Sequence, residues 1–300
     1  MAIKERVIAL GFFDGVHLGH AALLQRTVEE ARLRGVTPAV FTFAQPPKEV
    51  VTGIPCPLIN SAEDRRELVR RLYGIQDVIV VPFDHEMMTT SWEDFVTEIL
   101  IGRYHAVHLV AGHDHHFGHK NQGSPELLMA KCAELGLGCD IIPKVEIAGI
   151  TVSSTYIRRL VELGQIDRAN RFLGHPHTLT GVVGHGRGIG SSRLFPTANI
   201  QLPPNVLIPS HGVYATKVYL PDGASYTAVT NVGTRPTVNN GSDVTVEACL
   251  LDFEGDLYGK TLRLEFHSAL RQEVRFDSME ALKAQIAADV EATRAYFQNN

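Results

Sequence analysis

Apolar runs alternate with segments of helical character through the first half of this 300-residue chain, and that alternation limits the fold more than any other feature. Five runs are predicted to be strands, at residues 7–13, 36–43, 77–83, 105–111 and 139–143. Four segments between them are predicted to be helices, at residues 21–34, 60–73, 91–100 and 124–135. Strands that alternate with helices form a parallel sheet with helices on both faces. The N-terminal half is therefore predicted to be an α/β domain.

The second half changes character near His175, where short strand-like runs separated by Gly, Pro and Asn turns begin. The predicted strands lie at residues 179–183, 212–219, 225–232, 244–251 and 261–266, and one helix closes the chain at residues 278–297. Many short strands at this spacing favour a small antiparallel barrel. Residues 155–173 are predicted to form two short helices broken at Gly164. We therefore expect two domains, at residues 1–175 and 178–300.

Composition argues against several classes of protein. The net charge is −5, so no general basic surface is expected to attract nucleic acid. The four cysteines form no C-x-x-C pair, which is typical of reduced thiols in a cytoplasmic protein. The N-terminal apolar run, about seven residues, is too short for a signal-peptide core or a membrane span. We expect a cytoplasmic protein that binds neither nucleic acid nor membrane, and the sequence leaves its oligomeric state open.

The stretch GFFDGVHLGH, residues 11–20, lies where the first predicted strand runs into the first helix. In an open parallel sheet, ligands bind at such turns. Imidazoles here can face a phosphate, together with the positive field of the helix N-terminus. His17 and His20 share a face if the helix has begun, and glycines let the backbone approach a ligand. The candidate residues of this turn are Gly11, Asp14, Gly15, His17, Gly19 and His20. The alternative is that the two histidines serve only as polar caps of the helix. Zinc binding is less favoured, because no third ligand lies nearby in the sequence.

A second stretch, VSSTYIR at residues 152–158, places hydroxyl groups at a predicted helix start. Ser153, Ser154 and Thr155 supply the hydroxyls, and Arg158 follows about one turn later. Hydroxyls, free N–H groups and a guanidinium together suit an oxyanion. Taken alone, the stretch is equally consistent with an ordinary helix cap.

The run HDHHFGH, residues 113–119, has the ligand types of a metal site. Its histidines are nearly contiguous, however, and the end of a strand would point alternate side chains apart. We therefore interpret the run as the polar wall of a pocket.

In the second half, a glycine-rich segment at residues 184–190 precedes the run FPTANI. Its glycines suit a flap over phosphates, although an ordinary loop has the same composition. Thr197 and Asn199 alternate along an extended run, and their oxygens suit Mg²⁺. Glu247 is a carboxylate in an otherwise apolar strand, which makes it a candidate functional residue. The alternative is that it is an ordinary strand residue whose side chain faces outward.

His17-Leu-Gly-His20 together with Ser153-Ser-Thr-Tyr-Ile-Arg158 resembles the nucleotidyltransferase half of the prokaryotic bifunctional riboflavin kinase/FAD synthetases. The segments PTAN, NVGTRPT, VE-x-x-LLDF and GDLYGK resemble the riboflavin kinase half, so the resemblance covers nearly the whole chain. It implies a Rossmann-like nucleotidyltransferase domain followed by a kinase barrel. It also implies that both histidines and the S-S-T-x-I-R segment hold phosphates.

For the kinase half, the resemblance implies that Thr197 and Asn199 bind Mg²⁺–ATP and that Glu247 is the catalytic base. Gly186, Gly190 and Pro196 are implied in nucleotide binding, and Asp114, Phe117 and Arg271 in flavin binding. The sequence departs from the family at three places. Gln45-Pro46 replaces the Pro-His of T-F-x-P-H-P, His115 replaces an aromatic residue of G-x-D-F-x-F-G, and Ser191–Leu194 replaces a segment with a glycine-arginine pair.

The predicted function follows from the resemblance. Riboflavin is phosphorylated to FMN by Mg²⁺–ATP, and FMN is then adenylylated by a second ATP to give FAD and pyrophosphate. Two alternatives stay open at this point: a single-activity enzyme with a weakened adenylyl site, and a flavin-binding regulator without turnover.

Overall fold

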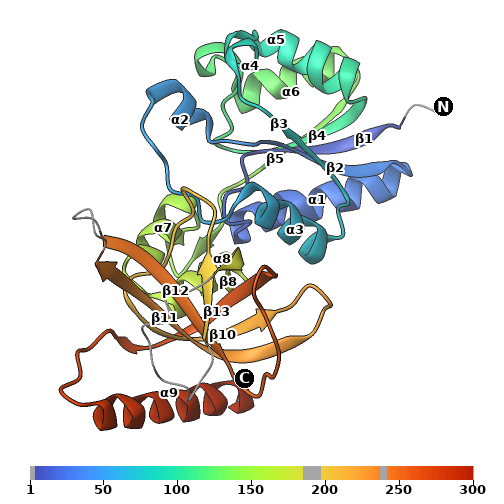
Figure 1. The fold of residues 1–300 in the computed structure, drawn as a ribbon. Coiled ribbons are helices and arrows are strands. Elements are labelled where there is room, and N and C mark those ends of the chain that lie inside the picture. Colours follow the sequence, from blue (N-terminus) through green and yellow to red (C-terminus); the bar gives the residue numbers. More distant parts are fainter. Residues whose placement is uncertain (1–3, 185–196, 237–241, 300) are drawn as a thin grey trace. The chain divides into compact units, whose positions relative to one another are not determined.

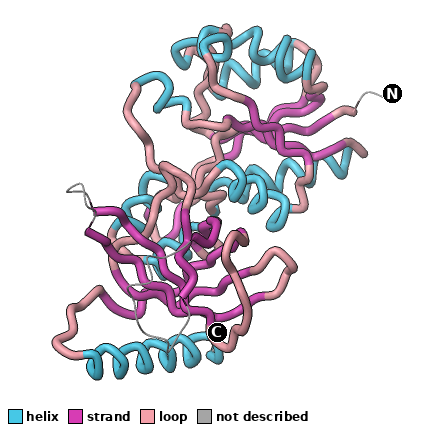
Figure 2. The backbone as a smooth tube through the Cα atoms, viewed as in Figure 1, coloured by secondary structure: helices cyan, strands magenta, loops and turns pink. Residues whose placement is uncertain are grey.

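The computed structural model describes residues 4–184, 197–236 and 242–299 (Figure 1). The chain divides into two compact units. The first contains Met1–Cys56 and Ala62–Ser154, and the second contains Pro57–Ser61 and Thr155–Asn300. Helices and strands mix in the first unit, whereas strands dominate the second (Figure 2). That residues 178–300 fold alone stays a prediction. Within the described ranges, no helix is long and apolar enough to cross a membrane.

The first unit is built from alternating strands and helices, as the sequence predicts. Its strands are β1 (Arg6–Leu10), β2 (Thr37–Phe43), β3 (Asp77–Val81), β4 (Ala106–Gly112), β5 (Gly138–Ile142), and the short β6 (Glu146–Ile147) and β7 (Ile150–Thr151). Its helices are α1 (Leu18–Arg34), α2 (Pro47–Thr52), α3 (Ala62–Tyr73), α4 (His85–Thr89), α5 (Trp92–Asp94), the π-helical η1 (Phe95–Arg103), the 3₁₀ turn η2 (His119–Asn121) and α6 (Pro125–Glu134).

The five main strands form one parallel sheet in the order β3-β2-β1-β4-β5. The order changes direction between β1 and β4, because β2 and β3 lie on one side of β1 while β4 and β5 lie on the other. In such sheets, ligands bind outside the carboxyl ends of the strands at this change of direction. The loops after β1 and β4 therefore meet at the edge where a ligand is expected.

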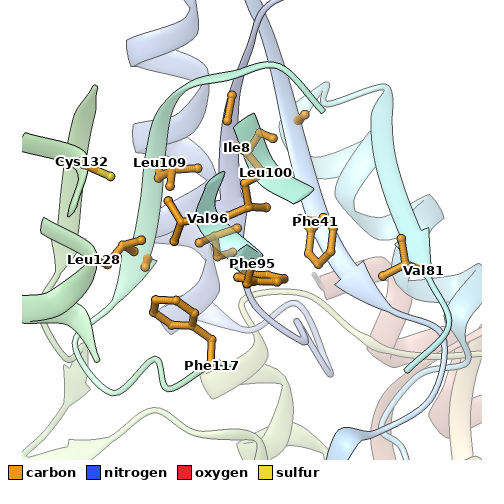
Figure 3. Close-up of a cluster of buried hydrophobic side chains, with 14 residues drawn as sticks. Ile8, Phe41, Val81, Phe95, Val96, Leu100, Leu109, Phe117, Leu128 and Cys132 are labelled. Atoms are coloured by element: carbon orange, nitrogen blue, oxygen red, sulfur yellow. The ribbon is translucent and has the colours of Figure 1, made fainter. Parts of the chain in front are cut away.

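Alternate residues of β1 serve two separate cores, one on each face of the sheet. Val7 and Ala9 pack with α1 and α3, whereas Ile8 and Leu10 pack with η1 and α6. Figure 3 shows the second of these clusters, in which Phe95, Val96 and Leu100 meet the sheet. Two buried faces explain why the sequence shows continuous apolar runs instead of alternating ones. The predicted α/β fold of this half is confirmed.

Several element limits differ from those expected. β1 ends at Leu10 and not at Phe13, because Phe13 adopts a left-handed φ of 57° that no strand allows. The helix expected at residues 91–100 is α5 continued by π-helical backbone to Arg103. α2 was not predicted: Pro46 and Pro47 open it, and it buries none of its residues. A helix without a buried face leaves no apolar periodicity in the sequence.

The second unit begins with two helices and continues as a barrel. The helices are α7 (Ser154–Glu162), whose first residue lies in the first unit, and α8 (Ile166–Leu173), and they are separated at Gly164 as predicted. The strands β8 (His177–Gly184), β9 (Thr197–Gln201), β10 (Gly212–Tyr219), β11 (Ser225–Pro236), β12 (Ser242–Leu250) and β13 (Thr261–Gln272) close in the order β10-β11-β12-β9-β8-β13. All these pairs are antiparallel, so the predicted barrel is confirmed.

The closing helix α9 (Met279–Asn299) packs against the outside of the barrel. Val290 of α9 packs on a small cluster made by Val213, Val229, Cys249 and Leu251. One partly buried ion pair adds to this packing. Asp289 accepts hydrogen bonds from Arg271 Nε at 3.0 Å and Nη2 at 2.8 Å. The helix is thus fixed over one face of the strands.

Candidate functional sites

The loop between β1 and α1 carries the first candidate site. Its path is sharply bent, since Phe13, Gly15 and Val16 have left-handed φ values of 57°, 82° and 42°. Phe13 and Val16 are almost completely buried, so packing holds them in a conformation that side chains rarely adopt. Strained backbone of this kind persists only where surrounding structure fixes it, and it gathers at binding sites.

Side chains from two distant segments hold this loop. Thr42 Oγ1 donates a hydrogen bond to the Phe12 carbonyl at 3.0 Å. Ser154 Oγ donates to the Asp14 carbonyl at 2.9 Å. The structure therefore brings Ser154, the first residue of the helix that carries the second motif, directly against the H-x-G-H loop.

The two histidines lie together at the start of α1. His17 is the N-cap residue, and its Nδ1 accepts a hydrogen bond from the His20 backbone N–H at 3.3 Å. The two rings stack with centroids 3.6 Å apart. Burial of the ring lowers the pKa of His20 well below its ordinary value, and neighbouring His17 and Arg65 lower it further. His20 is therefore neutral at physiological pH and can donate one N–H to an anion.

Gly19 lies beside the His17 ring, where any larger residue would be tightly packed. A Cβ atom at this position would lie 3.0 Å from the His17 ring and 3.5 Å from the Val152 carbonyl oxygen. The loop thus brings backbone close to the imidazoles, and the positive end of the α1 dipole lies at the same place. Buried imidazoles beside a helix N-terminus form a site suited to phosphate.

The S-S-T-x-I-R segment, the second stretch predicted to hold phosphate, lies at the start of α7. Ser153 precedes the helix, Ser154 is its first residue and Thr155 its second. Arg158 follows one turn later on the same helix. Ser153 and Ser154 belong to the first unit, whereas Thr155 and Arg158 belong to the second. The hydroxyls are thus placed at a helix N-terminus, as predicted from the sequence.

The loop after β4 contains the histidine-rich run. Phe117 is buried in the core, where its ring packs 5.6 Å from that of Phe95, while the Asp114 side chain is exposed. His115 stacks on Phe117 at 5.5 Å, and burial lowers its pKa to about 4, which keeps the ring neutral. Within the described ranges, no group of three or more His, Cys, Asp or Glu side chains is arranged to hold a metal.

In the second unit, strand register gathers the predicted kinase residues. Glu247 of β12 lies directly opposite Asn199 of β9 on one side and Asn231 of β11 on the other. Directly opposite residues of antiparallel strands point to the same face. Thr197, two residues from Asn199, shares that face, and so does Cys249, which packs against α9. The polar group therefore shares one face of β9, β11 and β12 with Cys249, while α9 itself packs mainly on β10, β11 and β13.

Of the remaining predicted residues of the second unit, the structure describes Arg271. Arg271 of β13 lies opposite Val213 and forms its ion pair with Asp289, so its guanidinium is already held by a carboxylate. The predicted nucleotide-contacting segment lies outside the described residues; it contains Gly186, Gly190, Pro196 and the departure at Ser191–Leu194. The roles predicted for all these residues stay predictions.

Sequence reasoning missed several buried charged residues, among them Arg65 and Asp289. Arg65 of α3 is 1% exposed and stacks on the Phe12 ring with its Cζ 4.2 Å from the ring centroid. Asp289 of α9 is 4% exposed. A signal for Arg65 was present in the sequence, because it lies three and four residues before the buried Leu68 and Val69. An arginine on an apolar helix stripe indicates a buried charge.

Comparison with known proteins matches one family model to each half of the chain. The FAD synthetase family model matches residues 1–156, and the riboflavin kinase family model matches residues 173–297. The bifunctional riboflavin kinase/FMN adenylyltransferase of Pseudomonas fluorescens is 38% identical over 289 residues, covering 96% of this chain and 92% of the relative. That of Listeria monocytogenes is 35% identical over 295 residues, covering 98% of this chain and 93% of the relative.

A solved structure from Streptococcus pneumoniae, described as a macrolide-efflux protein, has 29% identity and a TM-score of 0.85. It matches over 98% of this chain and 95% of its own. The matches to both family models favour the bifunctional enzyme over a single-activity enzyme or a regulator. This chain belongs to the family of bifunctional riboflavin kinases/FMN adenylyltransferases.

Proposed function

We propose that the chain makes FAD from riboflavin in two steps, with one reaction in each compact unit. The second unit phosphorylates riboflavin to FMN, and the first unit joins AMP to FMN. The observation that carries this proposal is that separate family models match the two halves of the chain, FAD synthetase at residues 1–156 and riboflavin kinase at residues 173–297. ATP is the co-substrate of both steps, and FMN is the product of one and the substrate of the other.

In the kinase step, Glu247 accepts the proton of the riboflavin 5′-hydroxyl. The hydroxyl oxygen then bonds to the γ-phosphorus of ATP, the bond to the bridging oxygen breaks, and ADP leaves. General-base assistance of this kind is typically worth about 10²–10⁴-fold in rate. The placement of Glu247 opposite Asn199 supports the assignment, because it puts the base beside the residues proposed to hold the nucleotide.

Thr197 and Asn199 are proposed to hold Mg²⁺. Their hydroxyl and amide oxygens are hard donors of the kind this ion prefers, and they alternate on one face of β9. When bound, Mg²⁺ neutralises part of the phosphate charge. Gly186, Gly190 and Pro196 are proposed to contact the same nucleotide.

In the adenylyl step, a phosphate oxygen of FMN bonds to the α-phosphorus of the second ATP, and pyrophosphate leaves. His17 and His20 donate hydrogen bonds to the crowded phosphate as its charge develops. The backbone of the loop approaches the nucleotide, and the α7 segment holds the departing pyrophosphate. The loop residues are Gly11, Asp14, Gly15 and Gly19, and the α7 residues are Ser153, Ser154, Thr155 and Arg158.

Asp114, Phe117 and Arg271 are proposed as flavin-binding residues. Phe117 is buried and Arg271 is held by Asp289, so in this structure both have protein partners. We place both reactions in the cytoplasm, which is supported by the presence of four free cysteines.

The test is to incubate the purified protein with riboflavin, ATP and Mg²⁺ and to separate riboflavin, FMN and FAD by chromatography. FMN is expected first and FAD later, and supplied FMN is expected to give FAD without riboflavin. Accumulation of FMN without FAD would leave only the kinase assignment. Absence of both products would refute the proposal.

A further inference from the structure

Arg65 is a buried cation whose hydrogen-bonding capacity is only partly used. Its side chain is 1% exposed, and Nη2 donates to the Phe43 carbonyl at 2.6 Å. Nε and Nη1 are also buried, yet neither has a hydrogen-bond partner among the residues that the structure describes. Burial lowers the pKa of Arg65 to about 10, so the group stays charged at neutral pH. Unsatisfied donors on a buried charge are costly, and they need an explanation.

The position of Arg65 suggests what would satisfy these donors. Its guanidinium lies on the ring of Phe12, inside the loop that carries the two histidines. It lies close enough to His20 to lower the pKa of that imidazole, and close enough to Asp14 for the carboxylate to raise the pKa of Arg65. The loop, the start of α1 and Arg65 therefore present N–H groups and positive charge in one place, at the carboxyl edge of the sheet.

A guanidinium offers donors in a planar fork that matches two oxygens of a phosphate. We propose that Arg65 is a phosphate-binding residue of the adenylyl-transfer site, and that Nε and Nη1 donate to phosphate oxygens of a bound substrate. This inference rests on the proposed function of the first unit and adds a residue to it. The phosphate belongs either to ATP or to FMN, and the experiment below separates the two sources.

The alternative is that Arg65 serves the fold alone. Arg65 would then donate a hydrogen bond to the Phe43 carbonyl, cover the Phe12 ring and balance the charge of Asp14. Asp14 lies near enough to raise the pKa of Arg65. Such a role leaves Nε and Nη1 without partners whether or not a substrate is bound. The two roles therefore differ in what happens to substrate affinity when the guanidinium is replaced.

The test uses the full chain with Arg65→Lys, which keeps the charge but loses the fork, and Arg65→Met, which loses both. Arg66→Met is the matched control, because Arg66 is the next residue of α3 and pairs only with Glu63 in the described structure. FAD formation is measured with ATP and FMN varied separately, together with inhibition by inorganic pyrophosphate. Riboflavin phosphorylation by the same samples reports on the state of the second unit.

We expect Arg65→Met to raise one Michaelis constant by about 10- to 100-fold, the range expected for a hydrogen bond to a charged group. Arg65→Lys should raise the same constant by a smaller factor, and Arg66→Met should change neither. A rise for ATP with weaker pyrophosphate inhibition assigns the phosphate to the nucleotide. A rise for FMN with unchanged pyrophosphate inhibition assigns it to the flavin.

The inference would be overturned if the Arg65→Lys and Arg65→Met proteins kept the parent values of both Michaelis constants and of pyrophosphate inhibition, even if turnover fell. If Arg65→Met does not fold, Arg65→Lys decides alone. A parent protein that forms no FAD from FMN and ATP would instead refute the proposed function, before any variant is compared.

Discussion

Replacing His17 by Ser separates the capping role that the structure shows from the phosphate-binding role that we propose. His17 caps α1 through Nδ1, and its ring also lies at the proposed phosphate site. Serine is among the best N-cap residues, so His17→Ser keeps the cap and removes the imidazole. His17→Ala removes both. The comparison of the two variants with the parent therefore isolates each contribution.

The two roles predict effects of different size. Loss of an N-cap costs about 0.5–2 kcal/mol of stability, and the 3.3 Å separation between Nδ1 and the His20 nitrogen places His17 at the lower end. Domains are stable by about 5–15 kcal/mol, so either variant stays folded and a residue that only caps would leave the rate unchanged. Removing one donor to a developing oxyanion costs about 10²–10³-fold in turnover.

We therefore expect both variants to lose adenylylation by about 10²–10³-fold, while only His17→Ala loses the stability of the cap. The assay measures FAD formation from supplied FMN and ATP, alongside urea unfolding of each protein. Riboflavin phosphorylation serves as the internal control and should stay at the parent rate. A His17→Ser protein that adenylylates FMN within about threefold of the parent, far short of the usual effect of an oxyanion donor, would show that His17 is a helix cap and nothing more.

Three further predictions concern the second unit. Glu247→Gln should lower riboflavin phosphorylation by about 10²–10⁴-fold without changing adenylylation of supplied FMN; a kinase rate near that of the parent removes Glu247 as the base. Asp289→Asn should lower the unfolding free energy of the barrel by about 1–3 kcal/mol in urea titrations, because it weakens the hydrogen bonds to partly exposed Arg271; no measurable loss would contradict this. Because burial holds the pKa of His177 at about 4, below the ordinary 6.5, unfolding takes up a proton between these values and stability falls as the pH drops. His177→Gln should therefore reduce the slope of unfolding free energy against pH in that range by up to about 1.4 kcal/mol per pH unit, and an unchanged slope would refute the argument.

Local pattern predicted most of the elements but not how they associate. The parallel sheet follows from the alternation of apolar runs and helices, because each run must be covered on both faces. The barrel order could not be derived in this way. β9 lies between β12 and β8, and this places Asn199 opposite Glu247 although 48 positions separate them in the sequence. Pairing at such separation depends on the whole set of strands and leaves no local signal.

The boundaries of the two units also depend on contacts between residues far apart in the sequence. Residues 57–61 lie in sequence between α2 and α3 of the first unit, yet they belong to the second. Asn60 Nδ2 donates to the Thr178 carbonyl at 2.9 Å, and the Leu58 backbone N–H donates to the Asn205 carbonyl at 2.8 Å. These bonds satisfy polar groups of residues more than a hundred positions away. A five-residue segment with no periodicity of its own cannot predict them.

Buried charges are the part of the site that sequence patterns hide most effectively. An arginine in a helix is ordinarily assigned to the exposed face, because charged side chains are rarely buried without partners. Arg65 and Arg66 are adjacent and chemically identical, yet Arg65 is 1% exposed while the Arg66 side chain is 32% exposed beside Glu63. The spacing of Arg65 from Leu68 and Val69 puts it on the apolar stripe of α3, and the register of α3 against the sheet turns that stripe inward. The inward arginine then meets the Phe43 carbonyl and the Phe12 ring, two groups at the ends of neighbouring strands. The charge at the proposed adenylyl site is therefore set by helix register, and a motif search confined to the H-x-G-H loop cannot find it.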